Sequence, residues 1–244
     1  MLRNSSTLNL FPLDNLIEIY DASEVNRIFV VGDLHGCYQE FINKLEQINF
    51  DFSHDIVISV GDLVDRGKES FKCLELVKQP WFKAIRGNHE QMCLEGAIAP
   101  EMKSFHCRHG GQWLYDLNNT QYNEALKLCL SLPIALEINF KGKIFGFIHA
   151  DIQINEWSEF KQKLLESNYF SNITQSTLQC ALWGRSRIRA AQNNIEMERI
   201  SGIDQLYLGH TVVDEPTQIQ NCFYIDTGVV FGGDLILHEI GTTF

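Results

Sequence analysis

Short runs of apolar, largely β-branched residues recur along the chain, and each gives way abruptly to glycine or polar residues. These runs span residues 27–31, 56–60, 81–85, 143–148 and 205–208. Their length and composition are typical of strands that are buried on both faces. Between the first three runs, apolar residues recur at helical spacing over 38–48 and 71–77. The pattern therefore predicts strands that alternate with helices, as in a parallel α/β sheet.

A long segment, residues 91–132, shows helical spacing of its apolar residues and no strand-like run. Gly110 and Gly111 interrupt it. We interpret the segment as a helical insertion that caps or walls a site at the edge of the sheet. No linker, repeat or low-complexity tract divides the chain, so residues 1–244 are predicted to form a single domain. Residues 1–25 carry no clear motif and are expected to wrap around that domain.

The C-terminal part of the chain is less regular. Residues 156–182 are predicted to be helical or loop. Two strand-like stretches, 223–225 and 235–240, flank the pair Gly232-Gly233. Such stretches on either side of a glycine pair predict a β-hairpin.

Polar side chains with metal-binding chemistry follow the ends of five predicted strands. They are Asp33, His35, Asp62, Asn88, His149 and His210. Asp33, Asp62 and Asn88 are separated by 29 and 26 residues, close to the roughly 30 residues of one βαβ unit. Right-handed crossovers would therefore bring these strand ends to one edge of a parallel sheet, where open α/β sheets bind ligands. Asp33 and His35 point the same way if the chain is extended, so both can reach one point.

The donor set predicts a catalytic metal centre. Carboxylate, imidazole and amide oxygen, without thiolate, suit Mn²⁺, Fe or Zn²⁺ better than a structural zinc site. Six such ligands exceed the needs of one catalytic ion. Asp62 comes from the middle strand of the first three and is therefore the natural bridge between two ions. Two metals about 3.5–4 Å apart lower the pKa of a shared water and hold a phosphoryl group for in-line attack.

Composition narrows the possible partners. The formal net charge of −11 argues against general nucleic-acid binding, which needs a basic surface. An anionic substrate would instead need local positive charge from metals or a few arginines. No apolar run is long enough to span a membrane, and the start of the chain lacks the pattern of a signal peptide. The seven cysteines are odd in number and never form Cys-x-x-Cys, so we expect reduced thiols in a cytoplasmic protein.

Taken in order, the motifs resemble those of a known family. They are GDLHGCY, VGDLVDRG, RGNHEQM, HAD, the WxR at 183–185, GHT and YIDTG. Together they are similar to the metallophosphoesterases of the phosphoprotein phosphatase type, in particular the bacterial and phage branch, over roughly residues 27–232. The resemblance implies an α/β calcineurin-like metallophosphoesterase fold with a β-sandwich core flanked by helices.

The resemblance also assigns the metal ligands. The first ion would be held by Asp33, His35 and Asp62. The second would be held by Asp62, Asn88, His149 and His210. Two divalent ions are thus expected, with Mn²⁺ as the first candidate and Fe or Zn²⁺ as alternatives.

The remaining roles that the resemblance implies concern proton transfer and phosphate binding. His89 would be the general acid, oriented by Asp65, while Arg66 and Arg185 would bind phosphate oxygens. Only the WxR resemblance selects Arg185, because two other arginines follow at 187 and 189. Glu90 is expected either to support the site or to favour the start of a helix. The histidines that match no motif are expected to be surface or packing residues: His54, His106, His109 and His238.

The predicted activity is hydrolysis of phosphoserine and phosphothreonine in phosphoproteins or phosphopeptides, with phosphotyrosine and phosphohistidine as further candidates. The alternative is a symmetrical bis(5′-nucleosyl)-tetraphosphate hydrolase, which is expected to use the same metal ligands. That enzyme type usually has alanine at the position of Asp65, so the motif favours the phosphatase. A catalytically inactive phosphoprotein-binding module is a third possibility, although every ligand and the acid are present. The physiological substrate, the native metal and the oligomeric state stay open.

Overall fold

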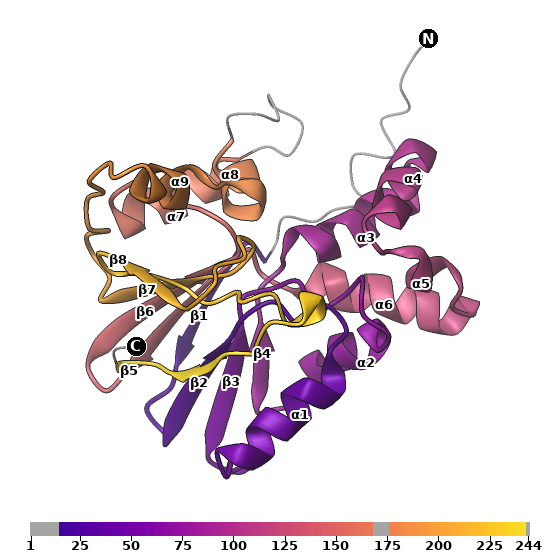
Figure 1. The fold of residues 1–244 in the computed structure, drawn as a ribbon, viewed down its shortest axis with the longest axis horizontal. Helices are drawn as coiled ribbons and strands as arrows, with labels where there is room; N and C mark the ends of the chain where they lie inside the picture. The colour runs from indigo at the N-terminus through magenta and orange to yellow at the C-terminus, as the bar shows by residue number, and fades with distance from the viewer. Residues whose placement is uncertain (1–14, 168–175, 243–244) are drawn as a thin grey trace.

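The computed structural model describes residues 15–167 and 176–242, and in this part of the chain two β-sheets pack face to face (Figure 1). Helices cover the outer face of each sheet, with α1 to α6 on one side and α7 to α9 on the other. This arrangement confirms the predicted β-sandwich core flanked by helices. The predicted lead-in and the segment 156–182 lie partly outside the described residues, at 1–14 and 168–175.

The four-stranded sheet contains the first three predicted strands. Its order is β10 (Leu237–Glu239), β2 (Arg27–Val31), β3 (Asp55–Ser59) and β4 (Phe82–Ala84). The strands β2, β3 and β4 are parallel, as predicted, and β10 is antiparallel to β2. The crossovers contain α1 (Tyr38–Gln47), α2 (Ser70–Glu75) and the 3₁₀ helix η1 (Leu76–Lys78). The carboxyl ends of all three parallel strands therefore meet at one edge of the sheet.

The six-stranded sheet contains both predicted and unexpected strands. Its order is β1 (Ile17–Asp21), β5 (Ala135–Phe140), β6 (Lys143–Ile148), β7 (Gln205–Leu208), β9 (Cys222–Tyr224) and β8 (Thr217–Ile219). The strands β6 and β7 have the predicted bounds. The strands β1, β5 and β8 were not predicted, and β1 shows that the expected lead-in contributes an edge strand, paired in parallel with β5.

The predicted C-terminal hairpin is wrong. The two stretches belong to different sheets, because β9 pairs with β7 and β8, whereas β10 pairs with β2. Between them, the 3₁₀ helix η2 (Val229–Phe231) carries the chain from one sheet to the other. Gly228 and Gly232, on either side of η2, have φ of 70° and 94°, a backbone conformation that favours glycine. The glycines therefore serve a sheet-to-sheet crossing and not a two-residue turn.

The predicted helical insertion forms four helices. They are α3 (Asn88–Ile98), α4 (Pro100–Arg108), α5 (Gln112–Tyr115) and α6 (Asn119–Ser131). The glycine pair at 110–111 separates α4 from α5, as expected. The opposite outer layer consists of α7 (Trp157–Leu165), α8 (Thr177–Trp183) and α9 (Ser186–Gln192). None of the described helices is both long and apolar enough to cross a membrane.

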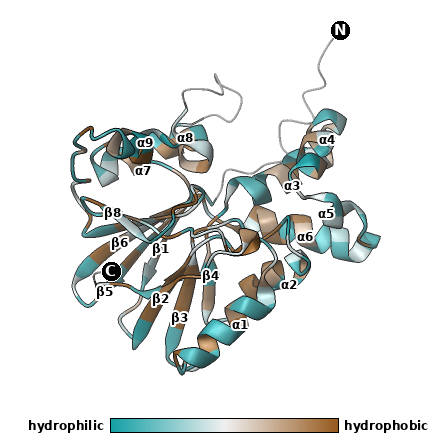
Figure 2. Cartoon of the chain, in the orientation of Figure 1, coloured by the Kyte–Doolittle hydropathy of each residue, from teal (hydrophilic) through white to brown (hydrophobic). Residues whose placement is uncertain are grey.

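Alternating side chains of the central strands fill two cores. Ile28 and Val30 of β2 pack between the sheets, against residues such as Phe147 of β6. Phe29 and Val31 point the other way, into the core beneath the helices. The same strands are coloured as hydrophobic along much of their length in Figure 2. Burial on both faces explains why these strands appear in the sequence as continuous apolar runs.

Candidate functional site

The loops after β2, β3, β4, β6 and β7 converge at one edge of the sandwich and bring the predicted ligands together. The ring Nδ1 of His149, after β6, lies 2.7 Å from the carbonyl oxygen of Val60, at the end of β3. The backbone nitrogen of His210, after β7, lies 3.1 Å from both carboxylate oxygens of Asp33, after β2. Two sheets thus contribute to one buried cluster, in which all six predicted ligands are at most 8% exposed.

Backbone strain is concentrated in these loops. Five non-glycine residues here have positive φ, between 42° and 73°: His35, Asp62, Asp65, Arg66 and His210. Residues other than glycine rarely adopt a positive φ, and those that do are often found at functional sites. The surrounding hydrogen bonds therefore have to hold the loops against a conformational cost.

Two glycines leave room for the carboxylates. A Cβ at Gly87 would lie 2.2 Å from Oδ1 of Asp62, and one at Gly209 would lie 2.1 Å from Oδ1 of Asp33. Both contacts are far shorter than van der Waals distance. The glycines of the GNHE and GHT motifs are therefore needed for the close packing of backbone against the acidic side chains.

Glu90 supports the loop that carries Asp62. Its carboxylate accepts hydrogen bonds from the backbone nitrogens of Asp62 (3.0 Å), Leu63 (2.8 Å) and Gly87 (2.8 Å). Burial, followed by the nearby charge of Asp62, raises the pKa of Glu90 to about 7. Glu90 lies in the first turn of α3, so both expectations for this residue describe its position.

Asp62 lies at the centre of the cluster. Its Oδ2 is 3.6 Å from Nε2 of His35, 3.4 Å from Nε2 of His149 and 3.9 Å from Nε2 of His89. Two groups of possible metal ligands share this carboxylate: His35, Asp62 and His89 form one, and Asp62, His149 and His210 form the other. Asp33 is in neither group. A position between two potential cation sites is what a bridging ligand requires.

The histidine rings present their lone pairs to the cluster. Nδ1 of His35 donates to the carbonyl oxygen of Val64 at 2.8 Å, and Nδ1 of His149 donates to Val60. Nε2 of each ring therefore faces the carboxylate and offers a lone pair whenever that ring is neutral. Nε2 of His149 also lies 2.8 Å from Oδ1 of Asn88, another acceptor. Acceptors that face one another in a buried site need a cation or a proton between them.

His210 is the clearest case. Its Nε2 is buried and has no hydrogen-bond partner among the described residues. Burial, together with the charge of His149, lowers the pKa of His210 to about 2, so the ring is neutral and its lone pair is available. An orphaned imidazole nitrogen beside a carboxylate fits a metal ligand.

The buried carboxylates add further acceptors to this cluster. Burial, then the charges of Asp226 and Asp62, raises the pKa of Asp33 well above its usual value. Asp226 belongs to the YIDTG motif, but no role was predicted for it. Three buried acids and several imidazole lone pairs thus meet with little compensating positive charge. The residues present fit divalent cations bound by oxygen and imidazole nitrogen.

His89 is held beside this cluster by Asp65. Its Nδ1 lies 2.6 Å from Oδ2 of Asp65, and its backbone nitrogen donates to Oδ1 of Asp62 at 2.9 Å. The ring Nε2 consequently faces Asp62, and the centroids of the His89 and His35 rings are 4.6 Å apart. The Asp65–His89 pair predicted from the sequence is therefore in contact, and its free nitrogen points into the site.

Two partners of Asp65 in the helical insertion were not predicted from the sequence. His106, expected to be a surface or packing residue, is fully buried, and its Nε2 lies 2.9 Å from Oδ2 of Asp65. Nε1 of Trp113 donates to Oδ1 of the same carboxylate at 2.6 Å. Burial would raise the pKa of Asp65, but the hydrogen bonds from His106 and His89 lower it. Because both new partners come from the helical insertion, no spacing from the GDLVDRG motif could have found them.

The arginines differ in what they can reach. Arg66 forms a hydrogen bond with the ring of His35, and Arg185 donates to the carbonyl oxygen of His210 at 3.4 Å. Arg187 is buried elsewhere and donates to the carbonyl oxygen of Glu198 at 2.7 Å. The structure therefore places Arg185, and not Arg187, at the candidate site.

Asp151 of the HAD motif fixes this arrangement. Its Oδ2 accepts from the backbone nitrogens of Ser186 at 2.5 Å and of Arg187 at 3.2 Å, at the start of α9. Ser186 directly follows Arg185, so the carboxylate holds the chain that presents the guanidinium. The HAD and WxR motifs thus form one structural unit although they are distant in sequence.

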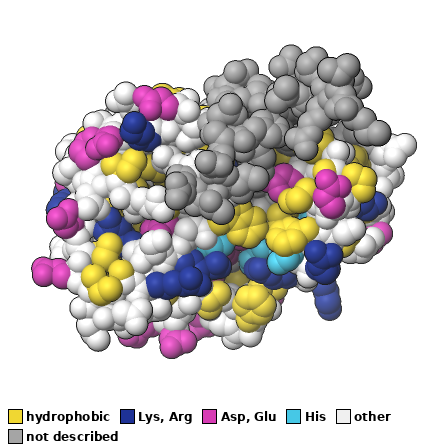
Figure 3. Space-filling view, turned by 90° about the horizontal axis from the view of Figure 1, so that it is seen from above, with side chains coloured by type: hydrophobic (Ala, Val, Ile, Leu, Met, Phe, Trp, Pro, Cys, Tyr) yellow, Lys and Arg dark blue, Asp and Glu magenta, His cyan; other side chains and the backbone are white. Residues whose placement is uncertain are grey.

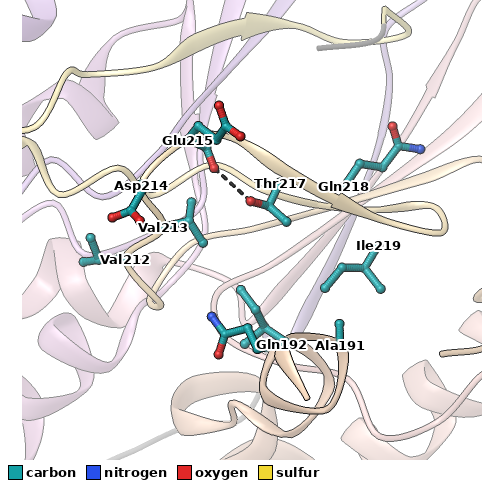
Figure 4. A pocket seen from close by; sticks show the side chains of 10 residues that line it. Ala191, Gln192, Val212, Val213, Asp214, Glu215, Thr217, Gln218 and Ile219 are labelled. Atoms are coloured by element: carbon teal, nitrogen blue, oxygen red, sulfur yellow. Dashed lines mark hydrogen bonds between the residues drawn. The ribbon is translucent and has the colours of Figure 1, made fainter. Parts of the chain in front are cut away.

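The surface supports an anionic ligand at this place. In the view from above, histidine side chains reach the surface near the middle of the face, with lysine or arginine side chains on both sides (Figure 3). A separate groove of about 610 Å³ lies between α9 and the chain after His210 (Figure 4). Its lining includes Asp214 and Glu215 but no lysine or arginine. That groove offers no positive charge for a phosphate.

The chain is similar to known proteins over most of its length. A sequence model of the calcineurin-like phosphoesterases matches residues 26–214. The chain is 34% identical over 229 residues to serine/threonine-protein phosphatase 1 of Salmonella typhimurium, covering 91% of this chain and 97% of that protein. It is 36% identical over 223 residues to serine/threonine-protein phosphatase 2 of Escherichia coli, covering 90% and 95%.

Two further similarities are more limited. A symmetrical bis(5′-nucleosyl)-tetraphosphatase of Glaesserella parasuis is 48% identical, but over only 64 residues, 25% of this chain and 24% of that protein. Among solved structures, a candidate diadenosine tetraphosphatase matches with a TM-score of 0.62 and 17% identity, over 92% of this chain and 98% of that one. A protein serine/threonine phosphatase from Saccharomyces cerevisiae matches with a TM-score of 0.56 and 18% identity, over 98% and 88%. At these identities the solved structures show the fold alone.

The shared position of Asp62 predicts a specific loss of metal. We expect Asp62→Asn to reduce the bound divalent metal from two equivalents to one or fewer, because an amide lacks the charge to join two cations. Asp55→Asn is the matched control, because Asp55 begins β3, at the end away from the Asp62 loop, and pairs with Arg27. Elemental analysis of both variants after dialysis is the measurement. Two equivalents retained in Asp62→Asn would rule out the bridge.

The position of Arg185 predicts weaker phosphate binding without metal loss. A guanidinium grips a phosphate through charge-assisted hydrogen bonds. We expect Arg185→Ala to raise the inhibition constant of inorganic phosphate at least about tenfold. Arg189→Ala, an exposed arginine on the same helix, should leave it nearly unchanged. The inhibition constants are measured beside metal content, and equal values for the two variants would remove Arg185 from the phosphate site.

Proposed function

Because the chain belongs to the calcineurin-like phosphoesterase family, we propose that it is a protein phosphatase that hydrolyses phosphoserine and phosphothreonine in polypeptides. The chain is a metal-dependent phosphoesterase, and the phosphoprotein substrate is the step that we add. The named relatives that match over nine-tenths of the chain are serine/threonine-protein phosphatases. This similarity supports a phosphoprotein as the substrate.

We infer that two divalent cations bind in the cluster and share Asp62. The first would be held by Asp33, His35 and Asp62. The second would be held by Asp62, Asn88, His149 and His210. When bound, the cations supply an activated water and neutralise charge on the phosphoryl group. Mn²⁺ is the first candidate, followed by Fe and Zn²⁺, because these ions accept mixed oxygen and imidazole ligands.

The side chains around the cations would orient the substrate. Arg66 and Arg185 supply guanidinium groups for the phosphate oxygens, one from each side of the cluster, since one contacts His35 and the other His210. Arg66 is additionally held by the ring of Phe231, whose centroid is 5.4 Å from the guanidinium carbon. Two guanidinium groups in fixed positions favour binding of the dianionic phosphate and set its orientation for in-line attack.

One observation carries the choice of substrate: His89 is held with its Nδ1 on Asp65 and its Nε2 toward the site. Asp65 fixes the orientation of the ring through Nδ1, so a proton carried on Nε2 would point toward the leaving oxygen. A serine or threonine alkoxide is a very poor leaving group and needs that proton. A nucleotide leaving through a phosphate oxygen, whose pKa is about 6, does not. An oriented acid therefore favours a phosphomonoester of an alcohol over a dinucleoside polyphosphate.

The alternative substrate is symmetrical diadenosine tetraphosphate, and a direct assay separates the two. With Mn²⁺ present, kcat/KM is measured for a phosphoserine peptide and for diadenosine tetraphosphate in the same preparation. We expect the peptide to be preferred by at least about tenfold, because only its leaving group gains from the acid. A preference for the dinucleotide would overturn the proposal. Absence of turnover with any phosphate ester would instead favour the non-catalytic binding module.

Cytoplasmic location stays a prediction based on cysteine usage. All seven cysteines are free thiols in the structure, and five of them are buried. Burial, followed by the charge of Glu40, raises the pKa of Cys37 to about 11, which makes this thiol beside the GDLHG motif unreactive. The cysteines therefore serve packing rather than the proposed chemistry.

The role of His89 predicts a loss that depends on the leaving group. A positioned general acid contributes about 10²–10⁴-fold, and we expect His89→Asn to lose that factor in kcat on a phosphoserine peptide. The loss on p-nitrophenyl phosphate should be roughly tenfold or less, because nitrophenolate leaves without a proton. His54→Asn, an exposed histidine paired with Asp51, serves as the control. Equal losses on both substrates, with metal retained, would assign His89 to phosphate binding instead.

A further inference from the structure

His106 lies behind the proposed acid and not in the cluster of metal ligands. It projects from α4 of the helical insertion, and neither its side chain nor that of Asp65 is exposed. Its Nε2 is within hydrogen-bond distance of both Asp65 oxygens, at 3.0 Å and 2.9 Å. Oδ2 of Asp65 is also the atom that receives Nδ1 of His89. A single carboxylate oxygen therefore links the two imidazoles.

Tyr115 determines which nitrogen of His106 carries the proton. The tyrosine hydroxyl lies 3.1 Å from Nδ1 of His106 and can donate to it. Nδ1 is then the acceptor, and Nε2 carries the hydrogen that Asp65 receives. The result is a continuous series of hydrogen bonds from Tyr115 through His106 and Asp65 to His89.

Glycines make space for the two members of this series that come from the helical insertion, His106 and Tyr115. A Cβ at Gly111 would lie 2.1 Å from Nε2 of His106, and one at Gly96 would lie 2.1 Å from the hydroxyl of Tyr115. Gly111 also donates its backbone nitrogen to the carbonyl oxygen of His106 at 3.0 Å. The second glycine of the pair that interrupts the insertion therefore leaves the space that the imidazole of His106 occupies.

A metal ion is the competing explanation for this group of side chains. Ligand atoms of Asp65, Cys93 and His106 lie within 4.8 Å of one another. Asp65, however, already receives N–H groups from His89, His106 and Trp113. Burial raises the pKa of Cys93 well above its usual value, which keeps this possible ligand a thiol. The site is thus filled by hydrogen bonds, and a cation would have to displace them.

We propose that His106 is a positioning residue that acts through Asp65 on His89. Its N–H fixes the rotation of the Asp65 carboxylate, so that Oδ2 stays aligned with Nδ1 of His89 while Nε2 of that ring faces the leaving oxygen. Trp113 restrains the other oxygen, Oδ1, in the same way. This inference rests on the proposed function, because it requires that His89 protonate a leaving group.

The test compares donors and non-donors at position 106. His106→Leu removes the N–H at similar volume, and His106→Gln keeps an N–H that can reach Asp65. We expect His106→Leu to lose roughly ten- to hundredfold in kcat on a phosphoserine peptide and less than about threefold on p-nitrophenyl phosphate. His106→Gln should recover most of the loss. Tyr115→Phe should show the same substrate dependence, at roughly three- to tenfold.

Leu128→Ala on α6 provides a control for destabilisation of the insertion. Leu128 is buried in the hydrophobic core against which Tyr115 packs. The Leu128→Ala variant should have a lower unfolding temperature but an unchanged ratio of kcat on the two substrates. If His106→Leu does not fold, His106→Gln and Tyr115→Phe still allow the losses on the two substrates to be compared.

The outcomes separate this inference from the proposed function. Equal losses on both substrates in His106→Leu, or in Tyr115→Phe where that variant alone folds, would overturn the positioning role while leaving the phosphatase intact. A His106→Gln variant as impaired as His106→Leu would also overturn it. Absence of turnover by the unaltered chain would overturn the proposed function, and the role of His106 with it.

Discussion

The structure depends on holding hydrogen-bond acceptors together around Asp62, although they repel one another in a buried space. Asp33, Asp62 and Asp226 are each no more than 3% exposed, and the lone pair of His210 has no partner among the described residues. Such a cluster persists only if the backbone is fixed independently of it. Glu90 does this for the Asp62 loop through backbone N–H groups, and the glycines at 87 and 209 allow the close approach. The same rigidity keeps metal ligands in place before a cation arrives.

The sandwich explains which parts of the fold could be predicted. The strands β2, β3, β6 and β7 carry long apolar runs because neighbouring layers bury most of their side chains. In β5 the run is broken by Glu137, which is buried because Trp157 and Lys161 bind its carboxylate. The strands β1 and β8 lie at sheet edges and lack such runs. The hairpin failed because local glycine spacing cannot show whether the next strand returns to the same sheet or crosses to the other.

In the site, too, local sequence predicts some residues, whereas others depend on how distant segments pack. The six candidate ligands could be named because each directly follows a predicted strand, and parallel strands end at one edge. His106 and Trp113 reach Asp65 from helices more than 40 residues away, and their approach depends on how the insertion packs. Before the structure, Gly110 and Gly111 showed only an interruption. The structure shows why glycine is needed at both positions: a Cβ at Gly110 would collide with the backbone of Arg66, and one at Gly111 would collide with the ring of His106. The insertion thus both covers this edge of the sheet and contacts Asp65, the partner of the proposed acid.

The most direct test of the central claim is anomalous diffraction from crystals grown with Mn²⁺, recorded on both sides of the manganese absorption edge. The account predicts two manganese peaks about 3.5–4 Å apart, one on each side of the Asp62 carboxylate, with His35 beside one and His149 and His210 beside the other. A single peak, or two peaks of which one makes no contact with Asp62, would contradict it.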